Sequence, residues 1–64
     1  MAAQKKSMAP LFTVAELARY LRVHPTTIYR LLRQQRIPAF RVANDWRFSA
    51  EEIDRWRRER ERGH

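Results

Sequence analysis

Residues 14–34, VAELARYLRVHPTTIYRLLRQ, contain two apolar stripes at helical spacing, separated by a short polar connector. The first stripe recurs at i, i+3, i+4 and i+7 and consists of Val14, Leu17, Ala18 and Leu21. The second stripe consists of Ile28, Leu31 and Leu32. Pro25 suits the first position of a helix, where a missing backbone N–H costs nothing. Because residues 22–24 leave room only for a turn, we expect helices at 14–21 and 25–34 to cross with their stripes facing, as in a helix-turn-helix.

The polar side of the second helix carries candidate DNA-binding side chains. This set is Thr26, Thr27, Tyr29, Arg30, Arg33 and Gln34. Arginine makes bidentate contacts with guanine, so this surface suits the major groove of DNA. The alternative is that Arg30 and Arg33 are ordinary solvated residues. Thr27 has a second interpretation, a role at the helix start only, and Tyr29 either contacts the sugar-phosphate edge or packs sideways against the hairpin that follows.

The charge of the chain is unevenly distributed. The formal net charge is +7 and the isoelectric point is near 11.3. Residues 1–48 hold nine Lys or Arg and two acidic residues, whereas residues 49–64 hold five of each. A basic surface confined to one part of a small domain indicates a polyanionic partner such as DNA.

Several function classes lack the residues that they need. The sequence has no cysteine, and its two histidines, His24 and His64, lie too far apart to form a recognisable metal site. Gly63 is the single glycine, which excludes a glycine-rich phosphate loop. The acidic cluster at 51–54 begins a predicted helix, where it suits the helix dipole. We therefore expect no enzymatic activity, no metal and no cofactor.

Capping signals mark the starts of the first and third helices. Thr13 with Glu16 predicts a capping box, and Phe12 is placed to pack on Leu17 as a hydrophobic staple. The same pattern returns in FSAEEI at residues 48–53. We therefore expect helices at 14–21 and 50–60.

The start of the middle helix is weaker. His24 is a poor N-cap, although Pro25 holds it in an extended conformation. We interpret His24 first as a turn residue and second as a phosphate contact.

Residues 39–48 predict a hairpin, or wing. Alternation on both arms places four apolar side chains on the face toward the helices, namely Phe40, Val42, Trp46 and Phe48. Arg41 and Arg47 then lie on the other face, and Asn44 with Asp45 forms the tip. We take Arg41, Asn44 and Arg47 as candidate DNA-backbone contacts, with an ion pair to an acidic residue such as Glu16 as the structural alternative for Arg47.

The remaining segments frame this domain. The third helix buries Ile53 and Trp56, and both tryptophans are assigned to the core and not to base stacking. We divide the chain into a disordered leader at 1–10, a DNA-binding domain at 11–60 and a frayed tail at 61–64. Lys5 and Lys6 in the leader are either solvated or a basic arm on DNA. No apolar run is long enough to cross a membrane and no signal peptide is present, so we expect a cytoplasmic, nucleoid-associated protein.

These segments resemble the excisionase-type, MerR-like winged helix-turn-helix domains over about residues 11–56. The matching motifs are TVAELARYL at 13–21, TIYRLL at 27–32, IPAFRV at 37–42 and WRF at 46–48. The resemblance implies a mainly α fold with a small β-hairpin, in which helix 25–34 reads the major groove and the 39–48 wing lies on the backbone or minor groove.

The sequence departs from this family at three turn positions. Arg22, Gln35 and Ala43 stand where the family often has glycine. A left-handed conformation would cost about 1 kcal/mol at each of the first two, so we expect those turns to differ. At the wing tip, Asp45 repels phosphate and argues against deep contact with the minor groove.

Sequence-specific binding of double-stranded DNA is the predicted function. The role that we expect is an excisionase-like recombination accessory or architectural factor, with an integrase or recombinase as a further partner. MerR-like regulators carry a dimerisation helix and an effector domain after the wing, which this sequence lacks, so we expect a monomer that binds cooperatively on DNA. The alternatives are a small MerR-like transcriptional regulator and a DNA-binding or protein-interaction fragment of a larger assembly.

Overall fold

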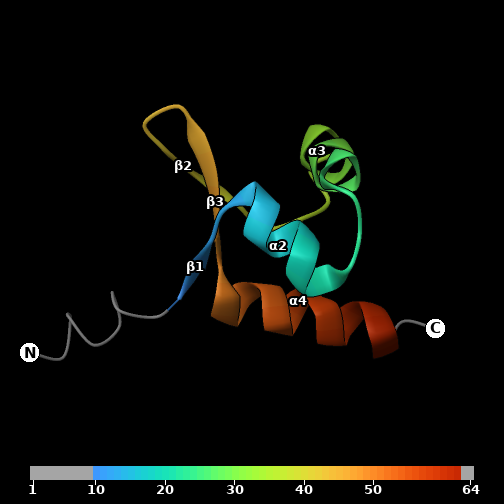
Figure 1. The fold of residues 1–64 in the computed structure, drawn as a ribbon. Helices are drawn as coiled ribbons and strands as arrows, with labels where there is room; N and C mark the ends of the chain where they lie inside the picture. Colours follow the sequence, from blue (N-terminus) through green and yellow to red (C-terminus); the bar gives the residue numbers. More distant parts are fainter. Residues whose placement is uncertain (1–9, 63–64) are drawn as a thin grey trace, which may run out of the picture.

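The computed structural model describes residues 10–62, which form three helices around a small three-stranded sheet (Figure 1). The elements in chain order are β1 (Leu11–Phe12), α2 (Val14–Leu21), α3 (Pro25–Arg33), β2 (Phe40–Val42), β3 (Asp45–Ser49) and α4 (Ala50–Arg62). This arrangement confirms the predicted fold class, a three-helix winged helix-turn-helix. The predicted basic residues Lys5 and Lys6 lie outside the described residues.

The two predicted capping boxes have different outcomes. At α2, the Glu16 N–H donates to Thr13 Oγ1 at 3.1 Å and the Thr13 N–H donates to Glu16 Oε1 at 3.0 Å, so that box is confirmed. At α4 only half of the box forms, with the Glu52 N–H 3.4 Å from Ser49 Oγ. Within residues 10–62 no return bond from the Ser49 N–H to the Glu52 side chain is present.

Strand β1 was not predicted. Phe12 lies opposite Phe48 in an antiparallel pair, and the Ala50 N–H donates to the Pro10 carbonyl at 3.1 Å. The Phe12 ring stacks on Tyr20, with centroids 5.0 Å apart. The segment before α2 therefore joins the sheet as well as packing beside the helix.

The helix ends contradict the expectation that glycine-free turns would differ. Arg22 and Gln35 both adopt the left-handed conformation, with φ of 61° and 56°. After α2, the Val23 N–H reaches the Ala18 carbonyl at 2.9 Å, and after α3 the Arg36 N–H reaches the Leu31 carbonyl at 3.0 Å. These are Schellman bonds, which satisfy carbonyls at the helix ends and offset a backbone cost of about 1–2 kcal/mol per residue.

The register of the wing overturns the predicted faces. Phe40 lies opposite Arg47, and Arg41 lies opposite Trp46. Residues directly opposite each other share a face, so Arg41 lies with Trp46 while Phe40 and Val42 lie with Arg47. Phe40 and Val42 are accordingly exposed, at 41% and 47%.

A two-residue loop causes this difference. Val42 pairs with Asp45, which leaves Ala43 and Asn44 as the turn. The positive φ falls on Ala43, at 57°, and not on the tip residues Asn44 or Asp45, whose residue types tolerate the left-handed conformation better. With two residues in the loop, each even-numbered residue of β2 lies opposite an odd-numbered residue of β3. The predicted faces instead required even-numbered residues of both strands to lie on one face.

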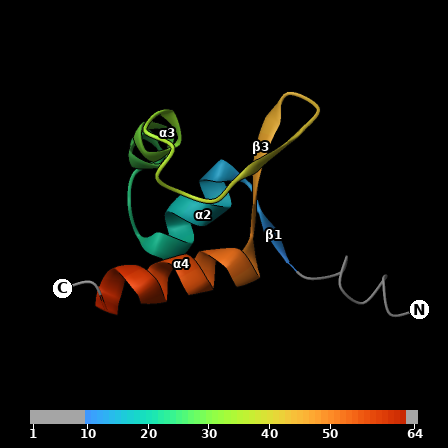
Figure 2. The same ribbon diagram turned by 180° about the vertical axis from the view of Figure 1, so that it is seen from behind.

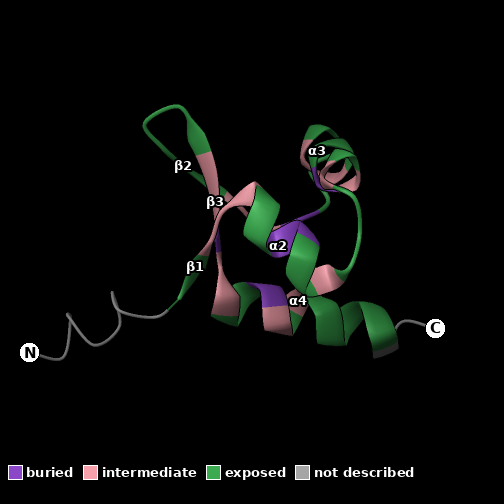
Figure 3. Cartoon of the chain, in the orientation of Figure 1, coloured by how far each residue is buried: buried purple, intermediate pink, exposed green. Residues whose placement is uncertain are grey.

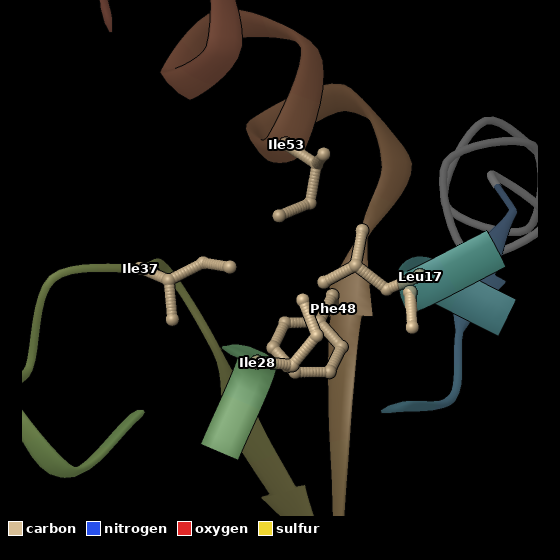
Figure 4. Packing of buried hydrophobic residues seen from close by; sticks show 6 residues of the cluster. Leu17, Ile28, Ile37, Phe48 and Ile53 are labelled. Atoms are coloured by element: carbon tan, nitrogen blue, oxygen red, sulfur yellow. The ribbon is translucent and has the colours of Figure 1, made fainter. Parts of the chain in front are cut away.

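The core lies where α2, α3, β3 and α4 meet (Figure 3). Its buried residues are Leu17, Ala18, Ile28, Ile37, Phe48 and Ile53. Figure 4 shows Ile28, Ile37, Leu17 and Ile53 surrounding Phe48. Each fully buried side chain of this size contributes about 1.5–3 kcal/mol, so this cluster fixes the crossing of the helices. Ile37, in the connection after α3, was not predicted as core.

Helix α4 holds the far end of α3 in place. The Trp56 Nε1–H donates to the Arg36 carbonyl at 2.8 Å, directly after the turn that ends α3. Trp46 and Trp56 are both half-buried against the core, as predicted. Helix α4 continues to Arg62, so residues 61 and 62, which we expected to fray, are helical, and Glu61 pairs with Arg57 at 3.3 Å.

Candidate nucleic-acid interface

Helix α3 and the wing project from the same side of the molecule. In Figure 1 they rise on either side of α2, while α4 runs along the opposite side, and the view from behind in Figure 2 agrees. A ligand that spans α3 and the wing would therefore lie across the side that faces away from α4.

The outer face of α3 carries most of the predicted residues. The exposed members are Thr26, Tyr29, Arg30, Arg33 and Gln34. Ile28 is fully buried on the opposite face, which holds the others outward. Thr27 is half-buried, and its N–H donates to the His24 carbonyl at 2.9 Å as part of the helix start. The structure thus brings five predicted residues to one surface and places the sixth at its border.

The arginines of this face have no acidic partner in residues 10–62. The ion pairs in this part of the chain are Arg47 with Asp45, Arg57 with Asp54 and Arg57 with Glu61. Residues 17–44 contain six arginines and no acidic residue. Arg30 and Arg33 therefore present an uncompensated positive charge, for which a polyanion supplies the missing partner.

The two wing arginines differ in environment. Arg41 is exposed and lies over the Trp46 ring, with Cζ 4.8 Å from the centroid. Arg47 is half-buried, donates to the Trp46 carbonyl at 2.9 Å and lies 4.0 Å from Asp45. The alternative predicted for Arg47, an ion pair with an acidic residue such as Glu16, is found with Asp45 as the partner, while the Glu16 carboxylate caps α2. Arg41 is the freer of the two for contact with DNA.

A groove connects α3 to the wing. It has a volume of about 300 Å³ and is lined by Thr13, Val14, Ala15, Tyr29, Asp45, Trp46 and Arg47. Tyr29 lines the groove from α3 and is 47% exposed, so the wing does not cover it. Asn44 is exposed at the wing tip, where it was predicted.

His24 is the N-cap of α3, although its residue type predicts a poor cap. Its Nδ1 accepts a hydrogen bond from the Thr26 N–H at 3.1 Å, and its backbone is extended, with φ −73° and ψ 145°. Histidine is not among the preferred capping residues, so composition gave little indication. The sequence signal for this cap is Pro25, which holds the preceding residue in the extended conformation that a cap residue needs, as predicted.

Other kinds of site find no support in this part of the chain. Among residues 10–62, no three His, Cys, Asp or Glu side chains come together in a way that could hold a metal ion. None of the described helices combines the length and the apolar character needed to span a membrane.

Two crossed helices, an outward basic face on the second and a β-hairpin beside it define a winged helix-turn-helix, a class of DNA-binding domain. Comparison with known families agrees, because a family model described as a helix-turn-helix domain matches residues 11–61. The chain belongs to this family, of the excisionase-like type, and is a DNA-binding helix-turn-helix protein. Searches of curated proteins and of solved structures return no significant match.

Proposed function

We propose that the protein binds double-stranded DNA at specific sequences, with α3 in the major groove and the β2–β3 wing on the adjacent backbone or minor groove. The observation that carries this proposal is the outer face of α3, where Arg30 and Arg33 are exposed and have no acidic partner in residues 10–62. The major groove is about 12 Å wide and admits one α-helix, and each bidentate arginine–guanine contact discriminates by about 1–3 kcal/mol.

The wing supplies contacts that position the domain without reading sequence. Arg41 extends from β2 over Trp46, and Arg47 borders the groove between the wing and α3. A phosphate of the duplex replaces the weak 4.0 Å partner of Arg47 with a charged acceptor that can be approached more closely. In this arrangement α3 specifies the sequence and the wing fixes the orientation.

Selection from a random pool of duplexes tests the sequence specificity. We expect one motif to be enriched, and gel-shift titration to give a lower Kd for that motif than for an unrelated duplex. With about five phosphate contacts, affinity should fall roughly 10²–10³-fold between 50 and 200 mM salt. Enrichment of no motif, or binding that is insensitive to salt, would contradict the proposal.

The biological role that we propose is that of an excisionase-like accessory or architectural factor that assists an integrase or recombinase. Two observations support this role. The chain belongs to a family of the excisionase-like type, and α3 and the wing lie on one side of the molecule, from which they could contact the groove and the backbone of a bent duplex at the same time. The free protein would be a monomer that occupies neighbouring sites cooperatively. A small transcriptional regulator remains the second candidate, since it needs occupancy of a promoter but no bend.

A circular-permutation gel assay separates these roles. The enriched motif is placed at different positions in fragments of equal length, and the mobility of each complex is compared. An accessory factor should make mobility depend on motif position, because a bend near the centre slows migration most. Equal mobility at all positions would remove the architectural role and favour the regulator.

A further inference from the structure

We propose that Trp56 is a positioning residue for DNA recognition, which fixes the orientation of α3 from α4, on the opposite side of the molecule (Figure 1). The inference deepens the proposed function and rests on it, since it assumes that α3 reads the major groove. The bond that carries it joins the Trp56 Nε1–H to the Arg36 carbonyl at 2.8 Å, across 20 residues of sequence.

The apolar contacts of α3 hold it against the core without fixing its rotation. Ile28 in its first half and Ile37 beyond its end are buried, while Leu31 and Leu32 are half-buried. The attraction between apolar surfaces is non-directional, so these contacts tolerate small rotations of the helix about its own axis. A rotation of this kind would change where the exposed side chain of Arg33 points.

Hydrogen bonds at Arg36 supply the missing direction. The Arg36 N–H donates to the Leu31 carbonyl at 3.0 Å, and the Arg36 carbonyl accepts from Trp56 at 2.8 Å. A single residue therefore holds the last turn of α3 through its N–H and is held by α4 through its carbonyl. Because hydrogen bonds weaken steeply away from linear geometry, this joint fixes the orientation of the turn that carries Arg33.

The two kinds of DNA contact differ in how much they depend on this orientation. A bidentate contact between arginine and guanine needs two aligned hydrogen bonds. Contact with phosphates depends mainly on charge and carries no sequence information. Loosening the joint should therefore weaken binding to the preferred sequence and leave non-specific binding as it is.

The substitution Trp56→Phe removes the N–H and keeps an aromatic ring beside the core. Apparent affinity falls with the fraction of the protein that is in the binding orientation, so we expect the Kd for the enriched duplex to rise by about three- to tenfold, the size of one hydrogen bond. The Kd for an unrelated duplex and the slope of log Kd against log salt should stay unchanged, because every arginine is retained. Gel-shift titration at a temperature well below the Tm measures these quantities.

Ser49→Ala is the matched control, since it removes one hydrogen bond from the other end of α4. It should lower Tm, as Trp56→Phe does, and change neither Kd. Unchanged affinity of Trp56→Phe, an equal loss for both duplexes, or the same loss of specificity in Ser49→Ala would each overturn the proposal. If the natural sequence preferred no duplex, the proposed function would fail instead.

A measurement on the natural sequence covers the case in which Trp56→Phe does not fold. Coupling between two sites is reciprocal, so the enriched duplex must strengthen the Trp56 bond by the same factor by which the bond strengthens binding. We expect the indole hydrogen of Trp56, followed by NMR, to exchange with solvent about three- to tenfold more slowly in the complex with the enriched duplex than in that with an unrelated duplex. Equal exchange rates in the two complexes would contradict the proposal.

Discussion

Helices α3 and α4 both display exposed arginines, yet the surroundings of these arginines are opposite. On α3, Arg30 and Arg33 lie in a stretch of chain without acidic residues. On α4, Arg57 pairs with Asp54 at 3.9 Å and with Glu61 at 3.3 Å. Exposure alone therefore does not make an arginine available to a ligand, because a charge that is already paired gains less from a phosphate.

Matched double substitutions test this contrast most strongly. Arg30→Ala with Arg33→Ala and Arg57→Ala with Arg60→Ala each remove two charges at the same spacing from one helix, and the α4 pair includes the ion-paired Arg57. We expect the α3 pair to raise the Kd for the enriched duplex by about 30- to 1,000-fold, corresponding to roughly 2–4 kcal/mol. The α4 pair should change it less than about threefold, as measured by gel-shift titration.

The salt dependence adds an independent measurement to this contrast. Each arginine of α3 that contacts a phosphate and not a base contributes about 0.9 to the slope of log Kd against log salt, so loss of the pair reduces the slope by up to about 1.8, whereas arginines remote from DNA leave it unchanged. Equal effects of the two pairs on both quantities would show that net charge, and not the face of α3, governs binding.

A smaller effect is expected at the joint that ends α3. Gln35 holds φ of 56°, a conformation that glycine adopts without steric cost. Gln35→Gly should raise the free energy of unfolding by about 0.5–1 kcal/mol, since relief of the left-handed strain exceeds the added entropy of the unfolded chain. Urea denaturation measures this change. A destabilised variant would indicate that the Gln35 side chain contributes contacts that outweigh its strained backbone.

The smallest effect concerns the internal electrostatics of the α4 side. The Tyr20 hydroxyl donates to Asp54 Oδ1 at 2.7 Å. This hydrogen bond raises the pKa of Tyr20 above its ordinary value, with desolvation and the Asp54 charge acting in the same direction and Arg57 opposing them. The folded state therefore holds the phenol proton more tightly than the unfolded state does.

The sign of the pH dependence follows from that raised pKa. The contribution of the Tyr20–Asp54 bond is fully present below the unfolded pKa of about 10 and is lost as pH rises through the folded pKa. Thermal melts from pH 8 to 11 should show a steeper fall in Tm for the natural sequence than for Tyr20→Phe. Parallel curves would mean that the bond does not persist in solution.

The helices were largely predictable because their signals are local. Thr13 and Glu16 lie three residues apart, and their side chains and backbone amides meet as soon as α2 forms. The outward direction of Arg30 and Arg33 follows from the same periodicity that buries Ile28. For these features the sequence neighbours already decide the structure.

The sheet was predicted less well because its pairing depends on distant residues and on loop length. Leu11 and Phe12 are too few to show alternation, and their partners lie 36 or more residues away in β3. The faces of the wing depend on whether the loop holds an even or odd number of residues, which Asn44 and Asp45 did not reveal. Without glycine in the turns, the residue types at positions 22, 35 and 43 did not indicate a left-handed conformation, and the family resemblance was the signal that marked these positions.

The stacking of arginine on each tryptophan has a practical consequence. Arg41 lies 4.8 Å from the Trp46 ring on the wing, and Arg60 lies 5.0 Å from the Trp56 ring on α4. The chain has two tryptophans, and they belong to opposite sides of the molecule. Because the two indoles emit in one overlapping band, a Trp56→Phe variant would leave Trp46 as an optical reporter of changes around the wing.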